Sequence, residues 1–311
     1  MDNTVDFISS NSNTVVKSLW KCHKEKYDKE HVQTDKQILI AEHGFSMLIR
    51  VSINEIYHSI LFDTGASNEG IIINAKLMGV NLNEIDMVVL SHGHYDHFGG
   101  LQTIVKAINK QNLPVITHEN MFRQHGTDSP CGVQVRPTFP DPKQLTPAKI
   151  INTKEPYLIA NQTVLITGEI PRKNSFEKGY HLNRILKDKV WEPDPWVLDD
   201  RSLVMNLKGH GLVIISGCAH AGIINTIQHA QKITSIKKIY GIIGGFHLSG
   251  LENEKLIPQT LNELKQINPQ LIIPCHCTGW RANHTIAELF PQAYIHNSVG
   301  NLYQLDSNKG Y

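Results

Sequence analysis

The chain carries four potential metal ligands within six positions, in the segment Ser91-His92-Gly93-His94-Tyr95-Asp96-His97-Phe98-Gly99-Gly100. It follows a largely apolar run at residues 85–90 and precedes a helical pattern that starts near Leu101. Three imidazoles and a carboxylate side by side at a strand end are costly to desolvate unless an ion compensates them. These groups suit zinc, iron or manganese, and their spacing lets one short loop surround an ion. The segment therefore predicts a metal site rather than a solvated, histidine-rich turn.

Polar residues follow four other apolar runs, and functional residues of α/β proteins gather at such strand ends. These residues are Asp63, Cys218 with His220, His247, and His276 with Thr278. Asp63 fits a turn-forming aspartate as well as a site residue. The glycines before His247 let the backbone approach a ligand closely, so His247 is a candidate for proton transfer or substrate contact. A structural hydrogen bond is the alternative role for His247.

The H-x-H-x-D-H segment after an apolar strand resembles the metal motif of the metallo-β-lactamase superfamily. This resemblance implies that His92 and His94 bind one metal and that Asp96 and His97 bind a second. It also implies that His276 is the last ligand of the second metal. The implied cofactor is one or two divalent ions, zinc first, with iron or manganese as alternatives.

The resemblance assigns supporting roles and also shows departures. Asp63 is expected to support the metal loop, and Thr278 to support the site or contact substrate. Cys218 stands where many members carry a metal-bridging aspartate, so it is either a thiolate ligand or a small buried cysteine. His220 is either a ligand in its own right or a histidine at a helix start that caps the helix or touches substrate.

A second departure lies near Gly168, where other members have a histidine ligand and this chain has none. Glu169 is a candidate to contribute a carboxylate there. Arg172 is a candidate to hold an anionic group of the substrate.

Four runs, G-E-I-P-R, G-C-A-H-A-G, G-G-F-H-L and C-H-C-T-G, are similar to one branch of the superfamily over residues 37–305. That branch includes a methanopterin-pathway synthase and many metal-dependent hydrolases. The resemblance implies a hydrolase in which a metal activates water against a phosphate-containing or other ester substrate, with Asp96 orienting the water. One alternative is a transferase joining a pterin pyrophosphate-type donor to an aromatic acceptor, stacked on Trp191, Trp196 or Phe246. Another is a non-hydrolytic metal-binding or redox protein.

The elements that must position these residues alternate between strand and helix patterns, which indicates a layered α/β architecture. An early meander, the metal loop and later β/α units fit an αββα sandwich, the metallo-β-lactamase-like fold. Strands are predicted at 38–41, 45–51, 57–62, 87–90, 114–118, 163–167, 203–207, 212–216, 238–243, 271–273 and 293–295. Helices are predicted at 71–78, 101–109, 223–233, 256–267 and 285–290.

The domain prediction is one catalytic domain at residues 36–311, preceded by a flexible or loosely packed extension at 1–35. Proline-rich stretches at 121–156 and 173–200 interrupt the strand and helix patterns. We interpret them as insertions, either covering a cleft or forming ordinary surface loops.

Net charge and cysteine content indicate which partners and which compartment to expect. The chain has 311 residues and a net charge of +1, which gives no global attraction to nucleic acid or to membranes. Five cysteines without C-x-x-C pairs do not suggest a disulfide framework, and the N-terminus lacks signal-peptide features. We therefore expect a cytoplasmic enzyme acting on a small, anionic molecule, with the oligomeric state left open.

Overall fold

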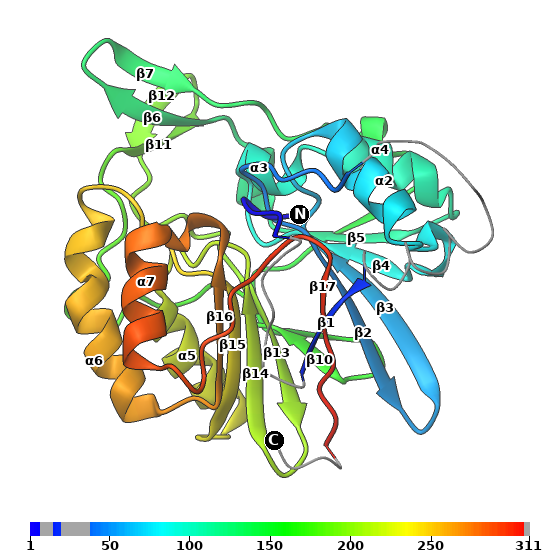
Figure 1. Cartoon of the computed structure of the whole chain (residues 1–311). Coiled ribbons are helices and arrows are strands. Elements are labelled where there is room, and N and C mark those ends of the chain that lie inside the picture. Colours follow the sequence, from blue (N-terminus) through cyan, green and yellow to red (C-terminus); the bar gives the residue numbers. More distant parts are fainter. Residues whose placement is uncertain (7–14, 20–37, 308–311) are drawn as a thin grey trace.

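The computed structural model describes residues 1–6, 15–19 and 38–307, which form four layers (Figure 1). Two β-sheets pack face to face, and helices cover the outer face of each sheet. The predicted αββα sandwich is confirmed. Within the described residues, no helix is long and apolar enough to cross a membrane.

Five strands form the first sheet, in the order β2-β3-β4-β5-β8. They are β2 (Met47–Ile53), β3 (Ile56–Phe62), β4 (Met87–Val89), β5 (Pro114–Thr117) and β8 (Lys149–Asn152). β2 and β3 form an antiparallel hairpin, while β3, β4, β5 and β8 run parallel. Helices α2 (Asn68–Leu77) and α4 (Leu101–Ile108) pack on its outer face. In α4 the buried positions 101, 104, 105 and 108 follow the helical period, which explains why this helix lies flat on the sheet.

Six strands form the second sheet, in the order β16-β15-β14-β13-β10-β9. They are β9 (Tyr157–Ile159), β10 (Val164–Ile166), β13 (Ser202–Leu207), β14 (Gly211–Ser216), β15 (Ile239–Gly245) and β16 (Leu271–Cys275). β14, β15 and β16 run parallel, and every residue of these three strands is buried. Helices α5 (Ile223–Thr234), α6 (Ile257–Ile267) and α7 (Trp280–Leu289) cover this sheet.

The central core lies between the two sheets. Successive side chains of a strand point to opposite faces, so Ile60 and Phe62 of β3 enter this core while Leu61 packs under α2 and α4. From the second sheet, Leu203 and Ile273 meet them. This packing fixes both sheets together and sets the spacing of the loops at their ends.

The two predicted insertions are more regular than expected. They supply β6 (His125–Ser129), β7 (Gly132–Val135), β11 (Asn183–Lys187) and β12 (Val190–Pro193). These strands form one antiparallel sheet in the order β12-β11-β6-β7, which we call the insertion sheet. It projects above the sandwich (Figure 1). Of the two predicted roles, the structure favours covering a cleft, because residues of both stretches line the cavity described below, and the strand pairing that builds this sheet joins segments far apart in sequence.

The N-terminal segment also differs from its prediction. The Asp2 carboxylate is buried and accepts hydrogen bonds from the His276 backbone N–H (2.8 Å) and from Asn297 Nδ2 (2.6 Å). β1 (Val16–Ser18) pairs with β17 (Asn301–Tyr303). A loosely packed extension is therefore wrong for residues 1–6 and 15–19, while residues 7–14 and 20–35 lie outside the described part.

Smaller corrections concern element ends. Residues 38–41 form no strand, and the strand predicted at 293–295 is reduced to one bridge between Ile272 and Tyr294. Helix α7 begins at Trp280, directly after the turn at Gly279, rather than near Thr285. The remaining short helices are η1 (Leu82–Glu84), α3 (Tyr95–Phe98), η2 (Glu119–Phe122), η3 (Pro142–Leu145), η4 (Asn253–Leu256) and η5 (His276–Thr278).

Candidate metal centre

The candidate site lies where five strands end at one edge of the sandwich. β3 leads to Asp63, β4 to the loop at 91–97, β14 to Cys218 and His220, β15 to His247, and β16 to His276. Because β3 and β4 run parallel, and β14, β15 and β16 also do, their carboxyl ends meet at the same edge. The predicted site residues at these ends are brought together by the fold.

Three imidazoles form the first group, which we call the three-histidine cluster: His92, His94 and His220. His92 Nε2 lies 3.0 Å from His94 Nδ1 and 3.1 Å from His220 Nε2. Ligands around a tetrahedral zinc ion are roughly 3.4 Å apart, given zinc–nitrogen bonds of about 2.1 Å. The three nitrogens therefore have the spacing of ligands converging on one ion.

The second group is the mixed cluster: Asp96, His97 and His276. Asp96 Oδ2 lies 3.8 Å from His97 Nε2 and 3.4 Å from His276 Nε2. His43, which the sequence reasoning missed, adds a further imidazole 3.5 Å from the same oxygen and stacks on the His276 ring. Carboxylate and imidazole together suit zinc, iron or manganese.

Unpaired buried nitrogens support metal binding at the mixed cluster. Among the described residues, His97 Nε2 and both ring nitrogens of His276 are buried and have no hydrogen-bond partner. Buried polar atoms are normally paired, so an orphan of this kind needs an explanation. His43, Asp96 and His276 place one ligand atom each within 4.8 Å of one another, and so do His92, His97 and Cys218, so the residues present fit a metal.

Protonation differs between the clusters. Burial holds the pKa values of His92, His94 and His220 well below the ordinary histidine value, which leaves these imidazoles neutral and able to ligate. Against the effect of burial, the carboxylates of Asp63 and Asp96 raise the pKa of His97 to about 9. Asp96 remains ionised, because the neighbouring His97 and His276 lower its pKa despite its burial.

Asp63 makes the contacts that its predicted supporting role requires. Its Oδ2 accepts hydrogen bonds from His97 Nδ1 and the Ser91 hydroxyl (both 2.7 Å), and its Oδ1 accepts from the Ser91 backbone N–H (2.6 Å). The bond to Nδ1 directs His97 Nε2 toward the cluster, as carboxylates commonly do for ligating histidines. Asp63 is therefore a positioning residue for the metal loop.

Cys218 lies between the two clusters. It belongs to three groups of close potential ligand atoms, with His92 and His97, with His220 and His247, and with His276 and Cys277. Its Sγ is 2.8 Å from the Cys277 sulfur and 3.3 Å from His247 Nδ1. Burial raises the pKa of the Cys218 thiol. Its ligand atom is close to atoms of both clusters, and its two predicted roles, ligand and buried cysteine, are both compatible with this position.

The loops at this edge share an unusual backbone. Asp63 (φ 59°), Ala219 (φ 56°), His247 (φ 49°) and His276 (φ 50°) all adopt the left-handed conformation without being glycine. This conformation costs about 1–3 kcal/mol for such residues and persists where the surroundings enforce it. Four of these strained positions at adjacent strand ends indicate that this edge is shaped for a site.

Three charged residues directly before β13 hold the two loops that carry the histidines of the three-histidine cluster. Asp199 accepts a hydrogen bond from the Gly93 backbone N–H (2.7 Å), and Asp200 accepts one from the Ala221 N–H (2.8 Å). Buried Arg201 donates to the carbonyl oxygen of Leu90 (2.7 Å). The sequence reasoning missed this triplet, although three charged residues directly before an apolar strand were a readable signal.

Two predicted site residues, Glu169 and Arg172, lie outside the clusters. Glu169 pairs with His118 (3.0 Å), and Arg172 donates to the carbonyl oxygens of Ile170, Trp196 and Val197. Neither lines the cavity described below, because the chain after β10 turns toward α5, where Asn225 accepts a hydrogen bond from the Lys173 backbone N–H. The structure thus does not place either at the site.

Thr278 supports the site only indirectly. Its hydroxyl accepts a hydrogen bond from the Phe246 backbone N–H (3.0 Å) and is fully buried, so it ties the β15 loop to the β16 loop. Phe246 lies in the core, and Trp191 and Trp196 do not line the cavity. The proposed stacking surface was therefore misplaced, and the aromatic rings at the cavity are those of Tyr95 and Tyr180.

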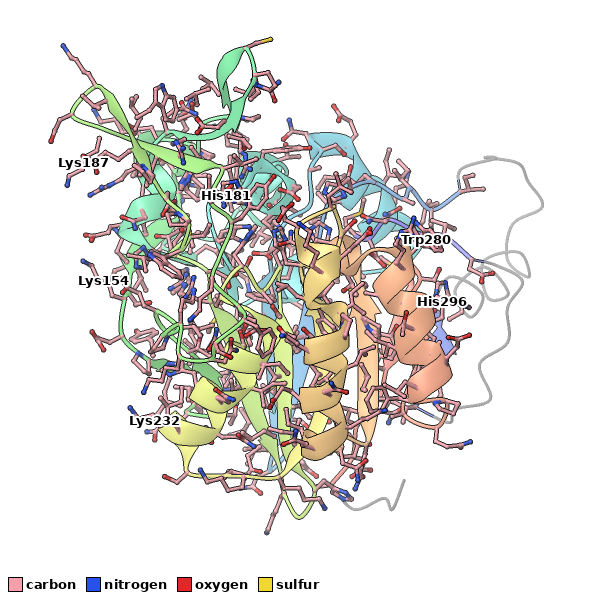
Figure 2. The ribbon with its side chains drawn as sticks, turned by 90° about the vertical axis from the view of Figure 1, so that its left-hand side faces the viewer. Lys154, His181, Lys187, Lys232, Trp280 and His296 are labelled. Atoms are coloured by element: carbon pink, nitrogen blue, oxygen red, sulfur yellow. The ribbon has the colours of Figure 1, made fainter. Side chains whose placement is uncertain are left out.

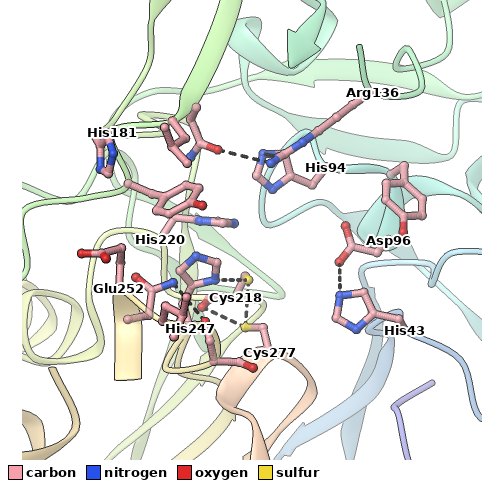
Figure 3. Close-up of a pocket in the computed structure, with 18 residues that line it drawn as sticks. His43, His94, Asp96, Arg136, His181, Cys218, His220, His247, Glu252 and Cys277 are labelled. Carbon is pink, nitrogen blue, oxygen red and sulfur yellow. Dashed lines mark hydrogen bonds and ion pairs between the residues drawn. The ribbon is translucent and has the colours of Figure 1, made fainter. Parts of the chain in front are cut away.

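The clusters open into a cavity of about 650 Å³ (Figure 3). His94, Asp96, Cys218, His220 and His247 reach its wall from the sandwich. The opposite wall comes from the insertion sheet and its flanks, including Arg136, Tyr180, His181 and Asn183, and from the loop at 249–253. A small molecule entering this cavity would meet both clusters.

Comparison with known proteins gives consistent matches. The family model described as the metallo-beta-lactamase superfamily matches residues 41–229. The chain is 33% identical over 274 residues to 7,8-dihydropterin-6-methyl-4-(beta-D-ribofuranosyl)-aminobenzene-5'-phosphate synthase of Methanocaldococcus jannaschii, covering 84% of this chain and 90% of that one. A second protein of that organism is 31% identical over 264 residues, covering 84% and 93%.

A solved structure also matches in fold. It is Tm1679, described as a metal-dependent hydrolase of the beta-lactamase superfamily. Its TM-score is 0.68 at 24% sequence identity, covering 86% of this chain and 94% of that chain.

Proposed function

Because the chain belongs to the metallo-beta-lactamase superfamily, we propose that it is a metal-dependent hydrolase of a phosphate-containing or other ester substrate. The observation that carries this proposal is the pair of ligand clusters on the wall of one cavity, with orphaned nitrogens in the mixed cluster. We propose zinc as the metal, with iron or manganese as alternatives. Bound there, a divalent ion lowers the pKa of water and polarises a phosphoryl or acyl oxygen.

The chain's own residues would hold and orient the reactants. The three-histidine cluster supplies three neutral nitrogens, and the mixed cluster supplies a carboxylate with two imidazoles. Asp96 lines the cavity and would orient the attacking water through a carboxylate oxygen. His247, on the same wall, would exchange a proton with the leaving group.

A second candidate is favoured by one comparison. The relative at 33% identity is named as a synthase, and Tyr95 and Tyr180 offer aromatic rings at the cavity. The corresponding function is a transferase in which an aromatic acceptor replaces water and a pterin pyrophosphate is the donor. It uses the same ligand clusters.

Metal analysis and a substrate screen test both candidates. The protein is purified without added metal, its metal content is measured, and phosphodiester, phosphomonoester, lactone and thioester substrates are assayed. We expect bound metal and turnover of one ester class, with both lost in His94→Ala and Asp96→Ala. Metal content and activity unchanged in these variants would overturn the site. Consumption of a pterin pyrophosphate only when an aromatic acceptor is present would favour the transferase over the hydrolase.

A further inference from the structure

Arg136 reaches over the three-histidine cluster from the insertion sheet. It directly follows β7, and its backbone N–H donates to the carbonyl oxygen of His125 on the neighbouring strand (3.0 Å). The guanidinium lies on the cavity wall beside His94 (Figure 3). The sequence reasoning assigned anion binding to Arg172, and the structure places Arg136 at the cavity in its stead.

The side chains that form hydrogen bonds with this guanidinium are neutral. Nη2 donates to Thr127 Oγ1 (2.6 Å) and Asn183 Oδ1 (3.2 Å), and Nη1 contacts His94 Nε2. Within the described part of the chain, Arg136 forms no ion pair with a carboxylate. Burial lowers its pKa, but arginine stays charged in proteins. The half-buried guanidinium therefore carries a positive charge that Asp96 offsets from a distance but that no carboxylate contacts directly.

The contact with His94 cannot persist once an ion is held. His94 Nδ1 faces the other two histidines, 3.0 Å from His92 Nε2. A histidine that ligates through Nδ1 as neutral imidazole carries its proton on Nε2 and donates from there. Nε2–H and the guanidinium N–H of Arg136 would then face each other as two donors. An acceptor between them resolves this conflict.

We propose that Arg136 binds a phosphoryl group of the substrate, whose oxygens accept from both Arg136 and His94 Nε2–H. The planar guanidinium presents paired donors that match phosphate geometry. Asn183 and His181, from the same wall, add polar groups beside it. Glu252 also lines the cavity, but its carboxylate is paired with Lys255 (2.7 Å). The substrate class is therefore a phosphorylated small molecule rather than a neutral ester.

This inference rests on the proposed metal centre, but its test does not require turnover. Binding of inorganic pyrophosphate and of inorganic phosphate is measured by calorimetry on the metal-loaded and metal-free protein. The variants are Arg136→Gln, Arg136→Lys and, as matched control, Lys187→Gln. Lys187 is an exposed cation at the end of β11 in the same sheet (Figure 2) and does not line the cavity, so its loss removes equal charge away from the cavity.

Arg136→Gln should weaken binding of one or both anions at least about tenfold, because a charge-assisted bond contributes about 1.5–3 kcal/mol. Arg136→Lys should recover part of the affinity, and Lys187→Gln should bind as the unmodified protein does. Melting temperature and metal content should be unchanged in all three. Equal affinity of Arg136→Gln and the unmodified protein for both anions would overturn the inference. Absence of metal from the unmodified protein would instead count against the proposed function, and the anion titration would still decide the role of Arg136.

Discussion

The two ligand clusters differ in how much charge they hold before an ion arrives. In the three-histidine cluster, burial keeps His92, His94 and His220 neutral. In the mixed cluster, the carboxylates of Asp63 and Asp96 keep a proton on His97, whose pKa is about 9. An ion entering the first cluster displaces no proton, whereas an ion entering the second must displace one. The first cluster should therefore fill more readily at neutral pH.

The supports of the clusters differ in the same way. Asp199 and Asp200 hold the three-histidine cluster through backbone N–H groups of Gly93 and Ala221, one residue from a ligand. Asp63 instead binds the ligand side chain of His97 itself. One cluster is positioned by its loops and the other by a carboxylate that also sets protonation. Substitutions in the two clusters should therefore have separable effects.

Removing a ligand of the three-histidine cluster should have the largest effect. In His92→Ala, the remaining two imidazoles hold an ion poorly, and activity should fall at least about 10³-fold, since a metal contributes several kcal/mol to the transition state. Metal analysis and turnover check this. His229→Ala, a half-buried histidine of α5, is the control. Retention of full metal content in His92→Ala would contradict the assignment of the first cluster.

Asp96→Asn should break the mixed cluster alone. The Asp96 carboxylate lies next to the imidazoles of His97 and His276, and its negative charge attracts the ion. A neutral amide removes that attraction, so the protein should lose the ion of the mixed cluster and keep the other. Activity should fall about 10²–10³-fold if both ions act in catalysis. Metal-to-protein ratio separates this result from that of His92→Ala. Loss of both ions together would mean that the clusters form one site rather than two.

The outcome for the site shows what sequence can predict. The loop at 91–97 was readable because its candidate ligands are close together in sequence and directly follow a strand. His220 and His276 were readable because parallel strands bring their ends to one edge. Position along the chain was enough for these residues, since the fold class alone determines where strand ends meet.

His43 and Arg136 were not predictable in this way. His43 lies before β2, and Arg136 depends on the pairing of β6 with β11, which joins segments 47 residues apart at the Arg136 to Asn183 contact. No local pattern of apolar and polar residues predicts which of two distant strands pair with each other. Glu169 and Arg172 failed for the complementary reason, because the direction in which a loop leaves a strand depends on tertiary contacts such as that with Asn225.

Asp63→Asn should weaken the mixed cluster by about 10- to 100-fold in metal affinity, the usual effect of losing a carboxylate that orients a ligating histidine. The amide can place an N–H donor against His97 Nδ1–H, so the imidazole loses its direction. Asp199→Asn is the matched control, because its amide oxygen can still accept from the Gly93 N–H. Calorimetric titration of metal into both proteins checks the difference. Equal weakening in the two variants would show that the carboxylates act through general stability rather than through their clusters.

The smallest expected effect is the difference between the two clusters in how their metal affinity changes with pH. Below pH 9 the mixed cluster should gain about tenfold in affinity per pH unit, because the ion displaces the His97 proton, while the three-histidine cluster should stay nearly constant above pH 7. The metal-free protein should show the opposite trend in stability. The pKa of His97 is raised on folding, so its stabilisation is complete below pH 6.5 and is lost as pH rises to about 9, at a cost of about 3 kcal/mol.

Titrations of metal at pH 6.5, 7.5 and 8.5, with denaturant unfolding of the metal-free protein at the same pH values, measure both trends. Asp63→Asn is the internal control, since loss of the carboxylate lowers the pKa of His97 and should flatten both curves. If the two metal-binding steps shifted in parallel with pH, the protonation difference between the clusters would be wrong. If only the stability of the metal-free protein failed to fall with rising pH, His97 would already be neutral without an ion. The mixed cluster would then bind metal without displacing a proton, as the three-histidine cluster does.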